Sequence, residues 1–592
     1  MNSPSNLHIA WSELLIGALA SAGIRDLVVS PGSRSTPLVL AAAKESRLTC
    51  RVIIDERSAA FFALGQARAS GLPTALICTS GTAAAHYFPA IIEASQSFVP
   101  LLVVSADRPW EDRATGASQT IDQVKMFGDH VRHFADVGPP DASAFRAVAR
   151  IAAQCVHATM FPTPGPVQLN AQFRKPLEPV SVSGEEAWKP ALDEIIRNGP
   201  PKIFAASAGV HPHARETIAA ACEQERGLIV CGPSSASDPE IRESILKLAE
   251  HLQYPLLAEC TSQLRFGGAR AGVVHAASFD TLFRSSGFRA ANRADVILEF
   301  GAAPTSAGYA AYLAECPHAQ RFVIAEHGHA DPRGDASLIV HSDASLVARE
   351  LVRVSKRHES PHPDWSDVFA RADAAAWARA AEETNAADLN EAVVATAVVH
   401  ALPNGGTLVV GNSNPVRDLD TFVAPTSRDI AVVHQRGAAG IDGLVSGAAG
   451  FASLAAVPTL LYLGDVSFLH DLGGLASLKH VSSPLVIVVV NNEGGRIFEE
   501  LPIYGSSAAA STFEKFFATS QNIDFSAAAA AFGISFERVV DGSGLSRALE
   551  AGLARMSCTV IEARVPPHDG SARRRKFRAD VAQLLAAEAR LR

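Results

Sequence analysis

The sequence predicts an α/β protein of three consecutive domains, each built on a mostly parallel sheet. Short, nearly continuous apolar runs alternate with helical stretches along the chain, which is typical of strands covered by helices on both faces. The 592 residues exceed the roughly 250–300 residues that one hydrophobic core usually holds. Proline-rich and polar stretches interrupt the pattern near 173–201 and 355–365. We therefore expect domains at residues 1–180, 181–360 and 361–592.

The predicted strands fall into three groups, one for each domain. The first group is at residues 26–30, 51–55, 74–78 and 100–107, with a helix at 56–70; the second is at 202–206, 227–232, 294–301 and 321–326; the third is at 406–411, 430–435, 458–464, 484–491 and 558–565. Sheets of this type bind ligands at the carboxyl ends of their strands, so polar motifs that follow a predicted strand are the first candidates for a site.

An apolar stretch near the N-terminus, residues 14–23, is predicted to be a helix of the first domain. No Lys or Arg precedes it, which argues against a signal peptide. Its apolar positions share one helix face, namely Ile9, Leu14, Leu15, Ala18, Leu19 and Ala22. The longest apolar strand-like run, 485–490, is far too short to span a membrane, so we expect no stable membrane insertion.

Composition and charge exclude several classes of function. The net charge of -9 and the pI of about 6.1 make the protein a poor nucleic-acid binder, and an anionic substrate must be met by local arginines. The 8 cysteines are scattered without a C-x-x-C pair, so we expect reduced thiols and a cytoplasmic location. The basic run at 573–576 is expected to be a solvated patch.

Acidic and amide side chains follow two neighbouring strands of the last domain. One predicted strand ends in Asp465, and the next ends in Asn491-Asn492 followed by Gly494. Mg²⁺ prefers hard oxygen ligands and usually keeps phosphate oxygens in its shell. We expect Asp465, the side-chain oxygen of Asn492 and a backbone carbonyl at Gly494 to bind it. Either piece alone is common at strand ends, but together they resemble the signature of thiamine-diphosphate enzymes.

The residues around this motif predict a diphosphate site. A helix start after Gly464, at Val466 and Ser467, offers N–H groups and the positive end of a helix dipole. Gly494 and Gly495 lack side chains and allow the backbone to come close to a ligand.

Glu56 is the candidate for the carboxyl group that activates such a cofactor. It stands where a predicted strand gives way to a helix, and Asp55 is the expected cap of that helix. The position of Glu56, taken alone, is explained by a structural role at the start of the helix. With the metal motif in the last domain, Glu56 becomes the candidate to hydrogen-bond the aminopyrimidine of the cofactor, and burial should raise its pKa.

At this point the motifs resemble one family closely, the 2-succinyl-5-enolpyruvyl-6-hydroxy-3-cyclohexene-1-carboxylate synthases of menaquinone and phylloquinone biosynthesis. The resemblance spans the first and last domains and is weak in the middle one. It is carried by Ser-Pro-Gly-Ser-Arg-Ser-Thr-Pro at 30–37, Asp-Glu-Arg-Ser at 55–58, Thr-Ser-Gly-Thr-Ala at 79–83, Ala-Asp-Arg-Pro at 106–109, Gln119, Asp122-Gln123, and the stretches 413–417, 436–443 and 491–498.

The resemblance implies a transferase of the transketolase type with a thiamine-diphosphate-binding fold. Such an enzyme decarboxylates 2-oxoglutarate and adds the resulting succinyl carbanion equivalent to isochorismate, giving the product named above and CO₂. The family uses thiamine diphosphate with Mg²⁺ or Mn²⁺. Its cofactor lies between the first domain of one subunit and the last domain of another, which implies a homodimer or homotetramer.

The resemblance also implies roles for individual residues. Besides Glu56, the catalytic set is Arg34, Gln119, Arg417 and Arg436. The substrate set adds Ser33, Arg108, Ile497 and Phe498, and the cofactor set adds Ser413 and Ile441. Arginines suit the two dicarboxylate substrates because the guanidinium fork matches a carboxylate. Each arginine taken singly has a structural explanation: surface exposure for Arg34 and Arg436, a loop ion pair for Arg108, and a pair with Asp418 for Arg417.

Two departures from the family and three alternatives stay open. Ser118 precedes Gln119 where some relatives have Asn, and residues 301–308 lack basic residues that several relatives have, for which Arg265 or Arg270 could substitute. One alternative is another thiamine-dependent 2-oxo acid decarboxylase or an acetolactate synthase-like carboligase. A non-catalytic binding protein would be expected to lack Glu56 or the metal residues. A dehydrogenase would need a G-x-G-x-x-G turn after the first strand, which the sequence does not have.

Overall fold

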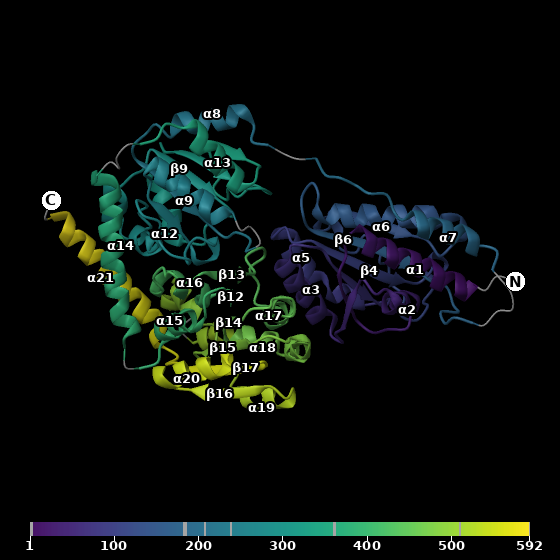
Figure 1. Ribbon diagram of the computed structural model, residues 1–592. Helices are drawn as coiled ribbons and strands as arrows, with labels where there is room; N and C mark the ends of the chain where they lie inside the picture. The colour runs from purple at the N-terminus through teal and green to yellow at the C-terminus, as the bar shows by residue number, and fades with distance from the viewer. Residues whose placement is uncertain are drawn as a thin grey trace. The chain divides into compact units, whose positions relative to one another are not determined.

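Three parallel sheets form the framework of the computed structural model, which describes residues 4–180, 186–206, 209–236, 240–358, 363–386, 388–507 and 511–590 (Figure 1). Every strand pair of these sheets is parallel, and helices connect the strands. The predicted α/β class is therefore confirmed. No helix in the described ranges is long and apolar enough to cross a membrane.

The first sheet has six strands in the order β2-β1-β3-β4-β6-β5. Its strands are β1 (Asp26–Val29), β2 (Thr49–Val52), β3 (Thr74–Cys78), β4 (Leu101–Asp107), β5 (His133–Val137) and β6 (Pro166–Gln172). The helices of this part are α1 (Pro4–Ala22), α2 (Thr36–Lys44), α3 (Glu56–Ser70), α4 (Ala83–His86), α5 (Phe88–Gln96), α6 (Phe145–Met160) and α7 (Lys189–Asn198).

The second sheet has five strands in the order β11-β10-β9-β7-β8. Its strands are β7 (Gly227–Cys231), β8 (Leu256–Ala258), β9 (Val296–Phe300), β10 (Gln320–Ile324) and β11 (Leu338–Val340). The helices are α8 (Pro212–Ala221), α9 (Ile241–Leu252), α10 (Phe279–Arg284), α11 (Ser286–Ala291), α12 (Ala307–Glu315) and α13 (Ala344–Val354).

The third sheet has six strands in the order β13-β12-β14-β15-β17-β16. Its strands are β12 (Gly406–Val410), β13 (Ile430–His434), β14 (Thr459–Gly464), β15 (Leu485–Asn491), β16 (Ser535–Val539) and β17 (Cys558–Arg564). The helices are α14 (Pro363–Thr384), α15 (Glu391–Ala401), α16 (Asn414–Phe422), α17 (Leu444–Ala452), α18 (Asp465–His470), α19 (Phe525–Ala531), α20 (Gly542–Leu553) and α21 (Asp569–Arg590).

The chain divides into two compact units that do not follow the order of the sequence. Unit 1 consists of Met1–Ala206, Gln435–Ala456 and His470–Ser483; unit 2 consists of Ser207–His434, Val457–Leu469 and Pro484–Arg592. Unit 1 therefore contains the first sheet together with α17, and unit 2 contains the other two sheets. The predicted domain boundaries stay predictions, because residues 181, 360 and 361 lie outside the described residues.

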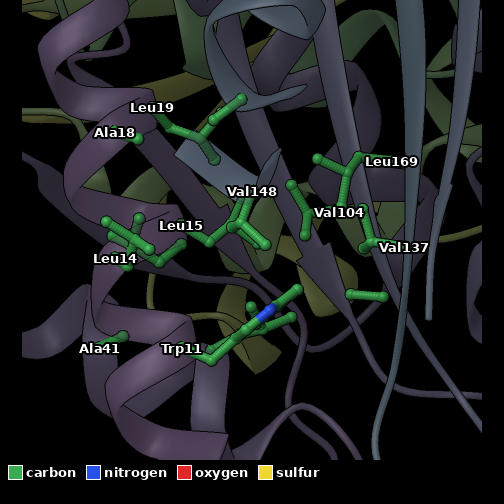
Figure 2. Close-up of a cluster of buried hydrophobic side chains, with 14 of the residues drawn as sticks. Trp11, Leu14, Leu15, Ala18, Leu19, Ala41, Val104, Val137, Val148 and Leu169 are labelled. Carbon is green, nitrogen blue, oxygen red and sulfur yellow. The ribbon is translucent and has the colours of Figure 1, made fainter. Parts of the chain in front are cut away.

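One face of the first sheet is covered by α1, α2 and α6. Trp11, Leu14, Leu15, Ala18 and Leu19 of α1 are buried and point toward the strands, as Figure 2 shows. Burial of each large apolar side chain contributes about 1.5–3 kcal/mol. This packing is why the N-terminal apolar stretch forms a helix of the first sheet layer, as predicted.

The helix that carries Glu56 is buried on nearly all sides. Residues 58–67 of α3 are all buried, and α3 packs closely on α17 within unit 1. A Cβ on Gly65 would lie 2.0 Å from the carbonyl oxygen of Gly447, and one on Gly450 would lie 1.9 Å from that of Phe62. The two helix backbones touch because these positions have no side chain.

The predicted strand at 202–206 is wrong. These residues have no regular structure and are exposed, with 86% of Phe204 accessible. The run is apolar, but no neighbouring strand supplies hydrogen bonds to it. Five strands were not predicted: β5, β6, β8, β11 and β16.

Candidate functional site

Asp465 joins the ends of two adjacent strands of the third sheet. It follows β14 and is 9% exposed. Its Oδ2 accepts the N–H of Gly494, beyond the end of β15, at 2.8 Å, and its Oδ1 accepts the N–H of Val466 at 2.9 Å. Each carboxylate oxygen keeps a further lone pair for a ligand. The Val466 N–H is thus already used, although it was predicted to be free for a phosphate.

Asn492 is oriented by a residue that sequence reasoning missed, Glu391. The Nδ2 of Asn492 donates to Oε1 of Glu391 at 3.3 Å, and both residues are buried. Because a carboxylate accepts from the amide nitrogen, the amide oxygen is left for another partner. An acid at the start of helix α15 looks like an ordinary helix-terminus preference, so the sequence offered no signal for this role.

The two glycines after β15 serve the fold in a way that was not predicted. Gly494 has φ +124°, and a Cβ there would lie 2.1 Å from the carbonyl oxygen of Ala518. The N–H of Gly495 donates to the same carbonyl at 2.6 Å. These two glycines therefore let the backbone come close to another segment of the protein, whereas we expected a close approach to a ligand. Gly464 is the glycine that faces open space, since a Cβ there would meet no atom within 4 Å.

A cavity of about 270 Å³ lies beside Asp465 within unit 2. Its polar lining includes Asp465, Asn491, Glu493, Arg538 and Arg564. Across the described residues no group of three or more His, Cys, Asp or Glu side chains is placed to hold a metal. The predicted set is one carboxylate, one amide oxygen and the Gly494 carbonyl, which already accepts the Arg496 N–H at 2.8 Å and keeps one lone pair. Such a set suits a hard cation that keeps phosphate or water in its shell.

Burial raises the pKa of Asp465 to about 6, although the N–H groups of Gly494 and Val466 act in the opposite direction. Burial disfavours the charged carboxylate. A cation bound at this position would restore the charged form, because an opposite charge within a few ångströms favours it.

Ser413 and Arg417 lie together at the end of β12. Ser413 has the unusual φ of +72° and is the residue before α16. Its carbonyl accepts from the Arg417 guanidinium at 2.6 Å, which turns Arg417 back toward the strand end. The suggested pair with Asp418 does not form: Asp418 is bound by two nitrogens of Arg574, at 2.6 and 2.8 Å.

Arg574 corrects the expectation of a solvated basic patch at 573–576. Arg574 is 2% exposed and its partner Asp418 is 1% exposed. The pair ties the C-terminal helix α21 to α16, the helix of Arg417. Sequence alone shows four basic residues in a row, whereas one turn of helix points only some of them at solvent.

Ile497 and Phe498 lie in a short 3₁₀ segment, Arg496–Glu500, after the glycines. Ile497 is half-buried and Phe498 is 37% exposed, with its ring 5.9 Å from that of Phe517. Arg496 is buried and pairs with Glu499 at 3.2 Å. The segment follows the predicted metal residue Gly494, and its role as an apolar wall stays a prediction.

In unit 1, the loop after β1 holds Arg34 inward. Arg34 is 4% exposed, and its guanidinium donates to the carbonyl of Phe173 at 2.5 Å. Its backbone N–H donates to Oγ1 of Thr79 at 3.1 Å, and a Cβ on Gly32 would collide with Thr79. Surface exposure is therefore wrong for Arg34. Ser33, its neighbour, is exposed.

Glu56 is the first residue of α3, and its carboxylate is not used for capping. Asp55 caps the helix, accepting from the N–H of Arg57 at 3.1 Å and the hydroxyl of Ser58 at 2.9 Å. No hydrogen bond or ion pair of the Glu56 carboxylate exists among the described residues. Burial is the main cause that raises the pKa of Tyr87, and the negative charge of Glu56 adds to it, so Glu56 lies near this buried hydroxyl.

Gln119 closes the loop after β3. Its Nε2 donates to the carbonyl of Ser80 at 2.9 Å, and the Ser80 hydroxyl donates to the Gln119 carbonyl at 3.1 Å. Gln119 has φ +55°, and Gly81 leaves room for its side chain. The Gln119 amide nitrogen is thus fixed by the fold, and the residue as a whole is exposed.

Arg108 is half-buried at the end of β4 and does not form the loop ion pair suggested for it. The carboxylate of Asp107 instead binds Arg113 at 2.8 Å, and only the backbone N–H of Arg108 donates to Asp107, at 2.7 Å. The fold therefore does not use the Arg108 guanidinium to neutralise its neighbour.

Arg436 and Ile441, both half-buried, lie on one loop of unit 1, residues 435–443. Gln435 Nε2 donates to the carbonyl of Asp442 at 3.1 Å, which closes the loop. Gly443 has φ +65°, and a Cβ there would lie 1.9 Å from the ring of Phe61 in α3. The loop is thus attached to the same helix that begins with Glu56.

Both arginines suggested as substitutes in the middle domain have partners within the protein. Arg265 is 1% exposed and donates to backbone carbonyls, among them Ala277 at 2.8 Å and Val423 at 3.0 Å. Arg270 pairs with Glu250 at 2.6 Å. Arg265 thus has a structural task, and a substrate role for Arg270 stays a prediction.

The predicted residues form two sets. In unit 2, Asp465, Asn492 and Gly494 meet at the ends of β14 and β15, with Ser413 and Arg417 at the end of β12. In unit 1, the predicted acid and arginines follow the strands of the first sheet or lie on loop 435–443. The first set suits a cation with anionic oxygens, and the second suits proton exchange and carboxylate binding.

Comparison with known proteins gives matches over most of the chain. Three family models match: the thiamine pyrophosphate enzyme N-terminal TPP binding domain at residues 9–126, the middle domain of thiamine pyrophosphate enzymes at 188–410, and the C-terminal TPP binding domain at 429–563. The benzoylformate decarboxylase of Polynucleobacter necessarius is similar in fold, with a TM-score of 0.68 and 16% identity, covering 94% of this chain and 99% of that one.

Several curated proteins match from end to end, and all three described here are named 2-succinyl-5-enolpyruvyl-6-hydroxy-3-cyclohexene-1-carboxylate synthase. The protein of Sorangium cellulosum is 50% identical, with 98% of this chain and 97% of that protein covered. That of Roseiflexus sp. is 38% identical, with 96% and 97% covered. That of Myxococcus xanthus is 39% identical, with 93% and 94% covered.

Proposed function

The chain belongs to the 2-succinyl-5-enolpyruvyl-6-hydroxy-3-cyclohexene-1-carboxylate synthase family of thiamine-diphosphate-dependent enzymes, and we propose that it makes this product from 2-oxoglutarate and isochorismate with release of CO₂. The observation that carries the proposal is the 50% identity to a curated synthase over 98% of the chain. The site residues described above are consistent with it, since carboxylate, amide and arginine groups stand at strand ends.

The residues at the ends of β14 and β15 fit the metal and diphosphate part of the cofactor. Asp465 and the Asn492 amide oxygen, with the Gly494 carbonyl, bind Mg²⁺ or Mn²⁺ in this proposal. Open space at Gly464 and the cavity beside Asp465 support it, as does the buried position of Ser467. Thiamine diphosphate, when bound, supplies the electron sink that allows a 2-oxo acid to lose CO₂.

Glu56 would exchange a proton with the aminopyrimidine when the cofactor is bound. Its carboxylate is free of protein partners among the described residues, whereas the neighbouring Asp55 is fully used as a helix cap. A carboxylate held at a helix start without a structural task is available for general acid–base work. Ile441 and Ser413 would contact the cofactor when it is bound.

The four arginines bind the carboxylates of the two substrates. Arg34, Arg108, Arg417 and Arg436 are buried or half-buried, which strengthens their pairing with an anion. Ser33 and Gln119 add polar contacts, and Ile497 with Phe498 excludes water from the reacting carbon. Holding both substrates makes the second bond-forming step effectively intramolecular.

The proposal includes a homodimer or homotetramer in the cytoplasm, acting in menaquinone biosynthesis. The family resemblance supports the assembly, and the names of the relatives support a biosynthetic role. Domains at 1–180, 181–360 and 361–592 stay part of the proposal. The alternative of another thiamine-dependent decarboxylase or an acetolactate synthase-like carboligase is not favoured, because the likeness to a decarboxylase at 16% identity concerns the fold alone.

The test is a reaction with purified protein, thiamine diphosphate, Mg²⁺, 2-oxoglutarate and isochorismate, followed by isochorismate loss and product mass. Each component is omitted in turn. Glu56→Gln is expected to lose about 10²–10⁴-fold in kcat, because the carboxyl group can no longer exchange a proton. Glu13→Gln is the matched control, since the half-buried Glu13 of α1 pairs only with the exposed Lys44 of α2 among the described residues.

Full activity of the control and loss in Glu56→Gln would support both the reaction and the acid. Turnover that needs all components but survives Glu56→Gln would remove Glu56 from the mechanism. Release of CO₂ from other 2-oxo acids with no use of isochorismate would reject the synthase and leave only a thiamine-dependent decarboxylase.

A further inference from the structure

A buried carboxylate outside the predicted site holds the loop of Arg436. Glu93 of α5 is 3% exposed. Its Oε1 accepts the N–H of Gly437 at 3.1 Å, and its Oε2 accepts the N–H of Ala438 at 2.7 Å. Two successive backbone amides of loop 435–443 are therefore bound by one side chain.

The carboxylate is itself fixed by a cation on a different helix. Arg68 of α3 donates to Oε1 of Glu93 at 2.7 Å and to the Ser97 hydroxyl at 3.2 Å. The side chain of Arg68 is 12% exposed. A buried carboxylate with a guanidinium and two amide donors is held in one place, because any movement leaves a charge unpaired.

The backbone of the loop rests directly on the end of α5. A Cβ on Gly437 would lie 2.8 Å from the carbonyl oxygen of Glu93 and 2.9 Å from the nitrogen of Ser97. This close approach is independent of the hydrogen bonds to the carboxylate. Both observations place residues 437 and 438 against α5, next to Arg436 on one side and a few residues from Ile441 on the other.

The two ends of the loop are held by other contacts. Its ends are joined by the bond from Gln435 to Asp442, and Gly443 is packed on Phe61. Between these points the Glu93 carboxylate accepts the backbone N–H groups of Gly437 and Ala438. The Glu93 carboxylate therefore fixes the backbone that directly follows Arg436.

We propose that Glu93, fixed by Arg68, is a positioning residue that sets the place of Arg436 for substrate binding. The inference rests on the proposed function, since it assumes that Arg436 binds a substrate carboxylate. A glutamine at this position would offer one acceptor oxygen and would turn an N–H₂ group toward an N–H donor. It would also leave the Arg68 guanidinium without its counter-charge.

A double-mutant cycle tests whether Glu93 acts through Arg436. Glu93→Gln, Arg436→Ala and the double variant are compared by kcat and KM for both substrates in the full-length holoenzyme. Glu93→Gln alone is expected to lower kcat/KM by about 10–100-fold for the substrate that Arg436→Ala also affects. In the Arg436→Ala background the same change should cost less than about threefold.

Equal losses in both backgrounds would mean that Glu93 supports the fold in general, which overturns the proposal. Ser97→Ala is the matched control, because it removes the hydroxyl contact with Arg68 and leaves both bonds from the carboxylate to the loop. Its kcat/KM should stay near the wild-type value. If Glu93→Gln fails to fold, Glu93→Asp takes its place, since it keeps the charge near Arg68 and withdraws it from the loop.

Hydrogen exchange of the peptide that covers residues 435–443 supplies a readout that needs no turnover. Glu93→Gln should speed exchange at Gly437 and Ala438 by at least about tenfold, and Ser97→Ala should not. Unchanged exchange would overturn the proposal. If the wild-type protein does not use isochorismate, the proposed function fails, and the exchange data still decide whether Glu93 holds the loop.

Discussion

The two six-stranded sheets of this protein have the same strand order but different residues at their carboxyl ends. The order β2-β1-β3-β4-β6-β5 of the first sheet corresponds strand by strand to β13-β12-β14-β15-β17-β16 of the third. β3 therefore corresponds to β14, and β4 to β15. The end of β3 carries Thr79-Ser80-Gly81, whereas the end of β14 carries Gly464-Asp465.

The two equivalent strand ends are closed to different degrees. After β3, the Gly81 N–H donates to Gln123 and the Ser80 carbonyl accepts from Gln119, so the protein fills its own loop. After β14, a cavity of about 270 Å³ lies beside Asp465. The fold thus supplies equivalent positions in the two sheets. The loop residues decide whether such a position is open to a ligand or is filled by hydrogen bonds within the protein.

A second contrast concerns how each sheet neutralises a buried aspartate. Asp107 at the end of β4 binds Arg113, whose side chain is 22% exposed. Asp418 of α16 binds Arg574, whose side chain is 3% exposed. The third sheet thus depends on a pair that is fully out of water, and the first sheet does not.

The largest expected effect is on stability, when the arginine partner of each buried aspartate is removed. Arg574→Met should lower the free energy of unfolding by about 3–5 kcal/mol, because it leaves Asp418 buried without a counter-charge. Arg113→Met should cost only about 1–2 kcal/mol, because Asp107 keeps donors from Asn170 and from the Arg108 backbone. Urea unfolding followed by circular dichroism measures both.

Adding Asp418→Asn to Arg574→Met should recover part of the loss, since the unpaired charge is then gone. Similar losses for the two arginine variants would show that exposure of the arginine does not govern the strength of these pairs.

The next effect concerns the equivalent ends of β14 and β3. Asp465→Asn should weaken binding of thiamine diphosphate with Mg²⁺ by about 100-fold or more, or ~2.7 kcal/mol, because a charged metal ligand is lost. Ser80→Ala should change it by less than about threefold. Titration calorimetry gives both affinities, and a large effect of Ser80→Ala would contradict the assignment of the diphosphate to the third sheet.

Metal removal should destabilise the wild type more than the Asp465→Asn variant. With Mg²⁺ and cofactor at about ten times the dissociation constant, binding stabilises the folded protein by about 1.4 kcal/mol. Chelation should remove this gain from the wild type and leave Asp465→Asn unchanged. Differential scanning calorimetry measures the shift, and equal shifts in the two proteins would place the metal elsewhere.

The smallest expected effect is a pH dependence of stability that comes from Asp471 in unit 1, a second buried carboxylate besides Asp465. Burial raises the pKa of Asp471 to about 6, against bonds from the N–H and hydroxyl of Ser446. Because the folded pKa lies above the unfolded value of about 3.9, this group's stabilisation is complete below about pH 4 and is lost as pH rises through about 6.

The unfolding free energy of the wild type, relative to Asp471→Asn, should therefore fall by about 1 kcal/mol from about pH 5 to about pH 7.5. Asp471 is closed in by protein donors, so Mg²⁺ and cofactor should not alter this profile. A profile that shifts when the cofactor is added would show that Asp471 is linked to the site.

Much of the site could be predicted because its residues follow apolar strands. β14 and β15 are continuous apolar runs, so Asp465 and Asn492 could be placed at strand ends from the sequence. β6 was missed although it is fully buried, since Gln168, Asn170 and Gln172 break its apolar pattern. Those polar groups are hydrogen-bonded to other side chains and backbone, which sequence periodicity does not show.

The structural tasks of charged residues could not be predicted in the same way. Arg574 and Arg265 are chemically like Arg34 and Arg417, and the sequence does not show that Arg574 lies in a buried ion pair or that Arg265 donates to distant backbone carbonyls. Glu391 and Glu93 were missed because their partners, Asn492 and loop 435–443, are distant in sequence. A local pattern carries no information about such pairs.

The α/β class, most of the strands and the family follow from the sequence, because apolar runs and strand-end motifs are local properties of the chain. The folded molecule was needed to show that residues 435–456 belong with the first sheet in unit 1, and which carboxylates are bonded within the protein and which line a cavity. The reason is physical: burial and hydrogen bonding depend on atoms brought together from distant parts of the chain, and these set the charge, orientation and accessibility of each side chain.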